Sequence, residues 1–277
     1  MNRSVVESFK LDGKVAIITG GAGLLGVQHA QAIAEVRGIP VLWDTDKDAC
    51  LKQSERIRQF FSVPSRGMCV DIASLDSVKK GLSDVLSLFN RVDILINNAA
   101  NNPKVKTGQD PTWSRFENYT LEIWNKDISV GLTGAFLCSQ IIGAKMVRQG
   151  KGVILNIASD LAIIAPDQRI YRQRGLPEEQ QPAKPVSYSI VKAGLLGLTR
   201  YLATYWADKG VRVNAISPGG VYTGQDAGFV QRLSKLIPLG RMAQKDEYKT
   251  AVIFLISDAS SYMTGANLVV DGGRTSW

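Results

Sequence analysis

Histidine and cysteine are scarce in this chain of 277 residues. His29 is the only histidine, which excludes histidine-dependent catalytic triads and the usual zinc sites. The three cysteines, Cys50, Cys69 and Cys138, are odd in number and far apart, so they indicate neither a disulfide framework nor a metal-ligand spacing. We therefore expect no bound metal and a reducing compartment, the cytoplasm.

Long apolar runs and blocks of one charge are also missing. The first eight residues lack the apolar stretch of a signal peptide, and no later apolar run approaches the length of a membrane span. The formal charge is +8, but basic residues are interspersed with acidic ones and form no tract with interleaved aromatics. We expect neither a membrane nor a nucleic acid as partner, because the positive field suits an anionic substrate or a dinucleotide better.

What the chain does contain is an alternation of apolar strands and amphipathic helices. With 45% hydrophobic residues, residues 1–277 can form one domain with a full core. Strands are expected at 14–19, 39–43, 66–70, 92–96, 152–158, 211–216 and 268–270. Helices are expected between them, among others at 47–60, 74–89, 121–148 and 246–257. This order predicts an α/β fold with a seven-stranded parallel sheet, helices on both faces and ligands at the carboxyl ends of the strands.

A glycine-rich turn follows the first strand, in Thr19-Gly20-Gly21-Ala22-Gly23-Leu24-Leu25-Gly26. Gly21, Gly23 and Gly26 let the backbone turn tightly, approach a pyrophosphate at a helix N-terminus and pack the helix on the strand. The second strand ends in Asp44, where a carboxylate can bind the adenosine ribose hydroxyls and repel a 2′-phosphate. The spacing therefore predicts NAD rather than NADP as the cofactor. Alternatively, Asp44 caps the helix that begins near Lys47.

Polar residues also follow later strands. Asp71 is either an adenine contact or a loop acid that caps the following helix. Asn98 follows the fourth strand. Ser159 is either a hydroxyl that faces the pocket or a cap for the next turn. Another turn at the cofactor edge is expected in Ser217-Pro218-Gly219-Gly220-Val221-Tyr222-Thr223.

Tyr188 and Lys192 are four residues apart in an apolar helix, so their side chains project from the same face. An ammonium next to a phenol favours the phenolate and lowers its pKa, so the pair can exchange a proton with an alcohol or a carbonyl. Tyr205 and Lys209 have the same spacing, but they lie where the helix ends before the strand at 211–216. We expect the first pair to be catalytic and the second to be incidental.

Three polar segments are expected around the pocket. A loop at 101–119, which includes Pro103, borders it, and an excursion at 160–186 lies beside it. The excursion carries Arg169, Arg172 and Arg174, which either bind a phosphate or carboxylate or belong to a solvated charge run. A short lid at 223–238 is polar, which argues against an apolar ketone such as a steroid as substrate.

The glycine turn, Asn97-Asn98-Ala99, Ser159, Tyr188-x-x-x-Lys192, Ser217-Pro218-Gly219 and Asp271-Gly272-Gly273 together resemble the short-chain dehydrogenase/reductase family. The resemblance implies a single Rossmann-type, doubly wound domain, usually a homotetramer and otherwise a homodimer. It also implies Tyr188 as general acid/base, Lys192 as the residue that lowers its pKa and holds the nicotinamide ribose, and Ser159 as a partner of the reacting oxygen. The cofactor-binding positions that it implies are Gly20, Gly21, Gly23, Leu24, Leu25, Gly26, Asp44, Asp71, Ile72, Asn98, Ala99, Tyr188, Lys192, Pro218, Gly219, Val221 and Thr223.

The chain departs from the family pattern at three positions. Leu24 replaces the middle glycine of the common turn, and Ala100 replaces the glycine of Asn-Asn-Ala-Gly. Gly131 stands where the family has the asparagine of its proton-relay tetrad. The missing side chain predicts room for an extra water in a rewired relay, and a glycine within a helix also suggests a kink or a close approach.

The excursion and the ending Thr264 to Trp277 resemble a narrower branch, the flagellin modification protein A type of oxidoreductase. That resemblance implies a role in bacterial nonulosonic acid sugars. We therefore predict an NAD-dependent oxidoreductase that interconverts an alcohol and a carbonyl on a polar substrate, a sugar or sugar phosphate that is anionic or polyhydroxylated. A catalytically weak, NAD-binding regulatory protein is the alternative, and Gly131 is the feature that favours it.

Overall fold

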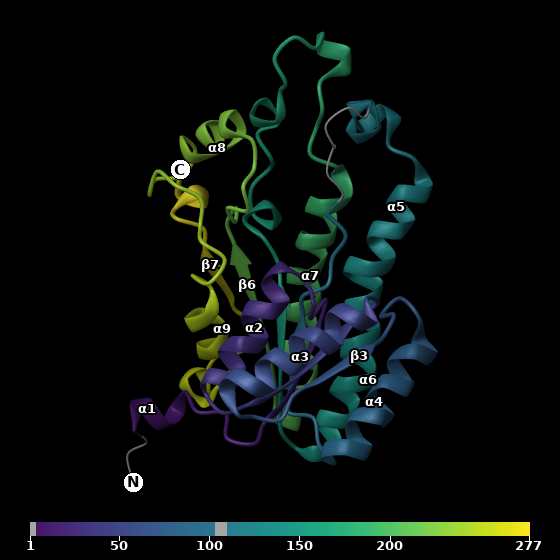
Figure 1. The fold of residues 1–277 in the computed structure, drawn as a ribbon, viewed down its shortest axis with the longest axis vertical. Helices are drawn as coiled ribbons and strands as arrows, with labels where there is room; N and C mark the ends of the chain where they lie inside the picture. The colour runs from purple at the N-terminus through teal and green to yellow at the C-terminus, as the bar shows by residue number, and fades with distance from the viewer. Residues whose placement is uncertain (1–3, 103–109) are drawn as a thin grey trace.

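The computed structural model describes residues 4–102 and 110–277, and its centre is a parallel sheet in the order β3-β2-β1-β4-β5-β6-β7 (Figure 1). The strands are β1 (Val15–Thr19), β2 (Ile39–Asp44), β3 (Arg66–Cys69), β4 (Ile94–Asn97), β5 (Gly152–Ile157), β6 (Val211–Pro218) and β7 (Asn267–Val270). The strand order reverses at β1, with β2 on one side and β4 on the other. This switch point is where an open α/β sheet leaves a crevice for a ligand.

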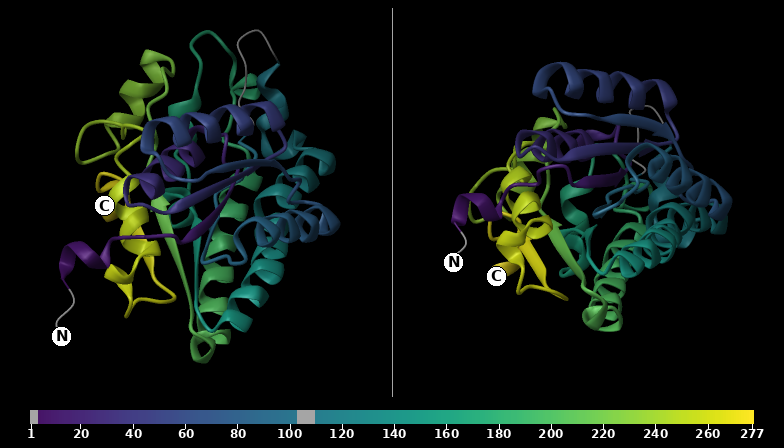
Figure 2. Two further views of the ribbon diagram at one scale, coloured as in Figure 1. Left: turned by 60° about the horizontal axis from the view of Figure 1, so that its bottom comes forward. Right: turned by 90° about the horizontal axis from the view of Figure 1, so that it is seen from below.

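Helices cover both faces of the sheet, which gives three layers (Figure 2). One face carries α2 (Leu24–Glu35), α3 (Lys47–Phe61) and α9 (Lys249–Ile256). The other carries α4 (Leu75–Phe89), α5 (Leu121–Ile128), α6 (Gly134–Gln149) and α7 (Val186–Tyr205). The two remaining helices are α1 (Val5–Ser8), which the sequence did not predict, and α8 (Ala227–Ser234). The predicted seven-stranded, doubly wound Rossmann-type domain is confirmed.

Alternation within the central strands explains the two apolar layers. Side chains of successive strand residues point to opposite faces, so Ala16 and Ile18 pack in one layer, and Val15 and Ile17 in the other. All five residues of β1 are buried. A strand buried on both faces therefore reads as a continuous apolar run, which is why β1 was recognised from the sequence.

The predicted long helix at 121–148 is a continuous helical stretch with an irregular centre. A π-helical turn at Ser129–Thr133 joins α5 to α6. The whole stretch, Leu121–Gln149, is long and apolar enough to cross a membrane by length and composition, so the expectation that no run approaches that length was wrong. Cys138, Ile142 and Met146 of α6 are fully buried against the sheet, which accounts for its apolar composition in this fold.

Two segments rise beyond the carboxyl edge of the sheet. The excursion at 160–186 contains only short 3-10 turns and stands above α7 (Figure 1). The predicted lid at 223–238 contains α8. Ile170 of the excursion packs with Leu233 and Ile237 of the lid in a small apolar cluster. Both segments thus form one cover beside the ligand crevice.

Candidate active site

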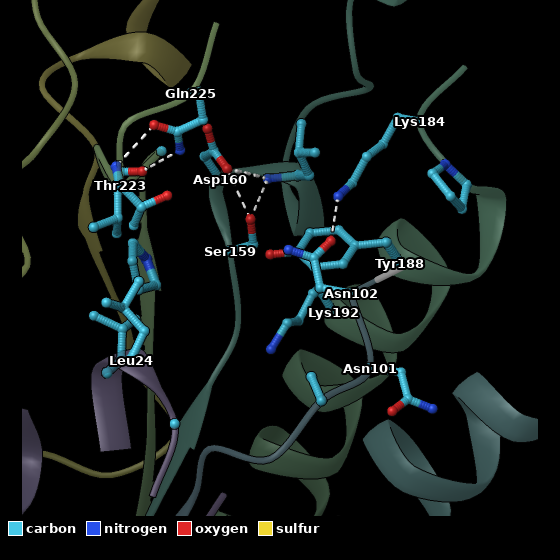
Figure 3. Close-up of a pocket in the computed structure, with 18 of the residues that line it drawn as sticks. Leu24, Asn101, Asn102, Ser159, Asp160, Lys184, Tyr188, Lys192, Thr223 and Gln225 are labelled. Atoms are coloured by element: carbon cyan, nitrogen blue, oxygen red, sulfur yellow. Dashed lines mark hydrogen bonds between the residues drawn. The ribbon is translucent and has the colours of Figure 1, made fainter. Parts of the chain in front are cut away.

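A cavity of about 1370 Å³ lies at the carboxyl ends of the strands, between the sheet and the cover (Figure 3). Drug-sized ligands occupy pockets of about 300–1,000 Å³, so this cavity has room for a dinucleotide together with a small substrate. Most of the predicted site residues line it: Gly20, Gly23, Leu24, Leu25, Asp44, Asp71, Ile72, Asn98, Ala99, Ser159, Tyr188, Lys192, Pro218, Gly219, Val221 and Thr223. Of the predicted residues, Gly21 and Gly26 do not.

Gly21 and Gly26 bring backbones together behind the cavity. A Cβ on Gly21 would lie 2.8 Å from the Leu42 Cα, and a Cβ on Gly26 would overlap the Gly20 carbonyl oxygen. Gly20 has a φ of +61°, which a side chain would strain. Gly23 is the N-cap of α2, so the first N–H groups of this helix face the cavity with no side chain in front of them.

The glycine turn is anchored to the end of β4. The Asn98 side-chain amide donates to the carbonyl oxygens of Thr19 (2.9 Å) and Gly20 (3.1 Å). In return, the Thr19 hydroxyl accepts from the backbone N–H groups of Asn98 and Ala99. Asn98 therefore uses its side chain to fix the turn, a role that the sequence alone did not indicate.

Asp44 does not cap α3, because Asp46 does so by accepting from the Ala49 N–H at 2.9 Å. The Asp44 carboxylate instead accepts from the N–H of Ala22 in the glycine turn at 3.2 Å. It is half-buried and lines the cavity. This arrangement places a carboxylate beside the turn that would hold the pyrophosphate.

Asp71 is exposed and accepts from the N–H of Ala73 at 2.9 Å, while Ser74 caps α4. Asp71 is thus a loop acid that also lines the cavity, and it is not the helix cap. On the opposite side, the lid begins in a turn in which Gln225 accepts from the N–H of Thr223 and donates to the Val221 carbonyl. These contacts hold Val221 and Thr223 at the cavity wall.

Ser159, Tyr188 and Lys192 lie close together on the cavity wall (Figure 3). The Lys192 Nζ is buried, donates to the carbonyl oxygen of Ile157 at 2.6 Å and lies 5.8 Å from the centre of the Tyr188 ring. Burial lowers the pKa of Lys192 to about 8, so it is mostly protonated at neutral pH. Ser159 combines both predicted roles, since it lines the cavity and also accepts from the N–H of Leu161.

The pKa of Tyr188 is not lowered in this structure, contrary to the expectation from its spacing to Lys192. Burial raises it, and a hydrogen bond with Ser159 opposes part of that rise. The nearby Asp160 carboxylate adds to the increase. Because its pKa lies above the ordinary value, Tyr188 is protonated at neutral pH, in the form that can donate a proton.

Lys184 is a further cation at Tyr188 that the sequence analysis missed. Its Nζ lies 3.7 Å from the centre of the Tyr188 ring and donates to the Asn102 side-chain oxygen at 2.8 Å. Lys184 and Asn102 both line the cavity. The predicted border loop therefore reaches the cavity through Asn102, whereas Pro103 falls outside the described residues. The signal in the sequence was a lysine four residues before the tyrosine.

Asp160 and Arg274 form a buried ion pair at the cavity wall, which the sequence analysis also missed. Their side chains are 4% and 6% exposed, and the Arg274 Nη1 donates to the Asp160 Oδ2 at 2.6 Å. The other Asp160 oxygen accepts from the Ser159 hydroxyl at 2.7 Å. A charged residue directly after a strand-end serine was the signal, but its partner lies 114 residues away in the chain.

Gly131 is buried within the π-helical turn, and Val191 of α7 fills the space beside it. A Cβ on Gly131 would lie 2.5 Å from the Val191 Cγ1. The expected room for an extra water at the missing side chain is therefore wrong, whereas the close approach is confirmed. Glycine is needed here because a neighbouring helix packs directly against its backbone.

The arginines of the excursion do not behave alike. Arg172 and Arg174 line the cavity, but Arg169 is exposed and pairs with Asp167. Arg172 also pairs with Glu178 on the surface, whereas Arg174 has no ion-pair partner in residues 4–102 and 110–277. Tyr205 and Lys209, the pair that we expected to be incidental, lie outside the cavity. Tyr205 is 61% exposed, and Lys209 pairs with Asp208. The described part of the chain contains no group of three or more metal-ligating acids, histidines or cysteines.

The chain is similar to known protein families, proteins and solved structures. The short chain dehydrogenase profile matches residues 14–171, and the enoyl-(acyl carrier protein) reductase profile matches residues 176–275. The D-threitol dehydrogenase of Mycolicibacterium smegmatis is 34% identical over 98% of this chain and 96% of its own. The NAD-dependent glycerol dehydrogenase of Listeria innocua is 32% identical over 97% and 96% of the two chains.

A solved structure supports the same assignment. The gluconate 5-dehydrogenase of Burkholderia cenocepacia, in complex with NADP and tartrate, superposes with a TM-score of 0.86 and 27% identity, covering 99% of this chain and 100% of that one. Because a profile covers more than half of the chain and relatives align along nearly all of it, the chain belongs to the short-chain dehydrogenase/reductase family of oxidoreductases that act on CH–OH groups.

Proposed function

We propose that this protein is an NAD(H)-dependent oxidoreductase that interconverts an alcohol and a carbonyl on a sugar-type substrate. The observation that carries the proposal is that Ser159, Tyr188 and Lys192 lie close together on the wall of a cavity large enough for a dinucleotide. Several relatives are named as dehydrogenases of polyols, namely threitol, glycerol and galactitol, which supports a polar substrate.

The residues of the crevice fit a nicotinamide dinucleotide. The uncapped start of α2 and the positive φ of Gly20 form a cradle that a pyrophosphate fits, since N–H groups at a helix N-terminus favour an anion. Asp44 would bind the adenosine ribose, and Asp71 and Ile72 would lie near the adenine. The Asp44 carboxylate supports NAD over NADP, although the relatives include both NAD-dependent and NADP-dependent enzymes. A bound nicotinamide supplies or accepts the hydride.

The side chains of Ser159, Tyr188 and Lys192 would move the proton. Tyr188 would donate its phenolic proton to a carbonyl oxygen or accept one from an alcohol, and Ser159 would bind the same oxygen. Lys192, protonated at neutral pH, places a positive charge near the ring and favours the phenolate that forms on proton loss. Its hydrogen bond to the Ile157 carbonyl keeps the ammonium in place.

The charge of the cavity supports an anionic or polyhydroxylated substrate. Arg172, Arg174, Lys184 and Arg232 line the cavity and, together with Lys192 and Arg274, outnumber its four acids, Asp44, Asp71, Asp160 and Asp226. The lid contributes Gln225 and Arg232 but also Phe229, so it is amphipathic. These cations argue against an apolar ketone as substrate.

A finer role rests on resemblance alone. The likeness of the excursion and of residues 264–277 to flagellin modification protein A oxidoreductases supports a place in bacterial surface-sugar biosynthesis. The family resemblance also supports a homotetramer or homodimer, and the free thiols of Cys50, Cys69 and Cys138 suit a reducing cytoplasm. A weakly active regulatory protein is less well supported, because Gly131 has a packing reason in this chain.

A spectrophotometric panel tests the proposal. D-threitol, glycerol, mannitol, galactitol and gluconate are each incubated with NAD or NADP, and the reduced cofactor is measured. At least one substrate should turn over with NAD. Tyr188→Phe should bind NADH with unchanged affinity but lose turnover at least about a hundredfold. NADH binding without turnover on the panel and on sugar phosphates would support the regulatory protein instead, and full activity of Tyr188→Phe would reject the mechanism.

A further inference from the structure

The buried ion pair of Asp160 and Arg274 lies next to the serine that would bind the reacting oxygen. Asp160 follows Ser159 directly, and its carboxylate accepts three hydrogen bonds: from the Ser159 hydroxyl (2.7 Å), the Leu161 N–H (2.8 Å) and the Arg274 Nη1 (2.6 Å). A buried carboxylate without a cation would be costly, and Arg274 supplies that cation beside Ser159.

The hydroxyl of Ser159 is oriented by these contacts. Its single proton is donated to Asp160, and one of its lone pairs accepts from the Leu161 N–H at 3.2 Å. A serine hydroxyl has one proton and two lone pairs, so the remaining lone pair is left for the hydrogen bond with Tyr188 or for a substrate hydroxyl that donates to it. The orientation of the hydroxyl thus depends on a carboxylate that does not itself need to touch a substrate.

A rigid turn carries Arg274 to this position. The Asp271 carboxylate accepts from the N–H groups of Gly273 (2.8 Å) and Thr275 (2.7 Å). Gly272 and Gly273 both have positive φ values, +68° and +89°, which glycine adopts without strain. A Cβ on Gly273 would lie 2.9 Å from the Pro238 Cγ, so this turn packs closely on the end of the lid.

The lid is also hydrogen-bonded to the same turn. The Leu239 N–H donates to the Gly272 carbonyl at 3.1 Å, and the Trp277 indole donates to the Leu236 carbonyl at 3.2 Å. The end of the lid and the turn therefore form one unit. A continuous set of contacts runs from this unit through Arg274 and Asp160 to Ser159.

We propose that Arg274 is a positioning residue for the reaction. It holds the Asp160 carboxylate, which in turn fixes the Ser159 hydroxyl, and it thereby connects the lid to the site of the reacting oxygen. This inference rests on the proposed function, because it assumes that Ser159 binds that oxygen. Its role differs from substrate binding, since Arg274 acts through another residue.

The test is a double-mutant cycle between Arg274 and Ser159, with the panel polyol of highest kcat/KM as substrate and NAD as cofactor. Arg274→Gln should lower kcat at least about tenfold with little change in KM, because a misplaced reacting group slows the chemical step. In the Ser159→Ala protein, whose residual turnover is measured at high enzyme concentration, the same change should alter kcat by less than about twofold. Arg274→Lys should restore part of the activity, since a single contact to Asp160 suffices for the link.

Arg212→Gln is the matched control. Arg212 is a partly buried arginine that donates to the carbonyls of Leu255, Met263 and Ser257, away from the cavity. The Arg212→Gln substitution should lower the midpoint of urea unfolding without changing kcat of the folded enzyme. The same kcat loss from Arg274→Gln with and without Ser159 would overturn the proposal, as would a rise in KM at constant kcat, which would make Arg274 a substrate-binding residue. Failure of the proposed function would differ from both, because the unsubstituted enzyme would then show no turnover.

Discussion

Gly131 offers the sharpest test of how packing limits this site. A Cβ at this position would lie 2.5 Å from the Val191 Cγ1, whereas carbon atoms in contact prefer about 3.5–4.0 Å, so any side chain is about 1 Å too close. Val191 lies on a helix and is β-branched, which leaves it one strongly preferred rotamer. The overlap therefore has to be relieved by moving α7, which carries Tyr188 and Lys192.

The expected cost follows from two opposing effects. Overpacking a core costs about 1–3 kcal/mol. Replacing a helical glycine with alanine gains about 0.5–1 kcal/mol. We therefore expect Gly131→Ala to lower the free energy of unfolding by about 1–2 kcal/mol, and Gly131→Asn, with its larger side chain, to lower it further and to reduce kcat.

Urea unfolding of four proteins measures the effect: the unsubstituted chain, Gly131→Ala, Val191→Ala and the double variant. Removing two methyl carbons in Val191→Ala costs about 1.6 kcal/mol by itself. In the double variant the new alanine can occupy the vacated space, so the two changes should be less harmful together than their sum by about 1 kcal/mol or more. Strict additivity would show that Val191 is not what excludes a side chain at position 131, and the packing explanation would be wrong.

Three further outcomes are expected. Asp44→Ala should narrow the preference for NAD over NADP in kcat/KM, because the carboxylate that repels a 2′-phosphate is gone; a native preference for NADP would contradict this. Arg174→Ala should raise KM for gluconate more than for a neutral polyol, by up to about tenfold from a contact worth about 1.5 kcal/mol, while Arg169→Ala, outside the cavity, should not; equal effects would return the excursion to a solvated loop. Burial lowers the pKa of His29 to about 4, below its value in the unfolded chain, so stability should be full above about pH 6.5 and fall by about 1.4 kcal/mol per pH unit toward pH 4. His29→Leu should flatten that part of the curve in urea unfolding at several pH values, and an unchanged slope would exclude His29 as its cause.

Most of the fold was predictable because its signals are local. Continuous apolar strands and periodic helices gave all seven strands in their right places, and the strand-end positions located the cavity residues. Local alternatives were harder to separate. Asp44 and Asp46 are both acids before one helix, and only the hydrogen bond to the Ala49 N–H shows that Asp46 is the cap.

The missed features depend on contacts between distant parts of the chain. Glycine at position 131 looked like lost relay chemistry, whereas its cause is Val191, sixty residues further on in another helix. Arg274 and Asp160 carry no motif of their own, and their pairing appears only once the sheet brings both ends of the fold together. A sequence pattern indicates what a residue type can do, but it does not show which distant residue contacts that residue in the fold.

The bond from the Ala22 N–H to Asp44 has a consequence for engineering the cofactor preference. The carboxylate that would discriminate between the two dinucleotides also supports the loop that would hold both of them. A redesign toward NADP that simply deletes the charge would therefore weaken the binding of either cofactor, since the loop loses an anchor. Asparagine at this position keeps an acceptor oxygen for the Ala22 N–H but removes the charge. Asp44→Asn should therefore relax the preference for NAD with the smallest loss of cofactor binding, and a cation for the 2′-phosphate can be added afterwards.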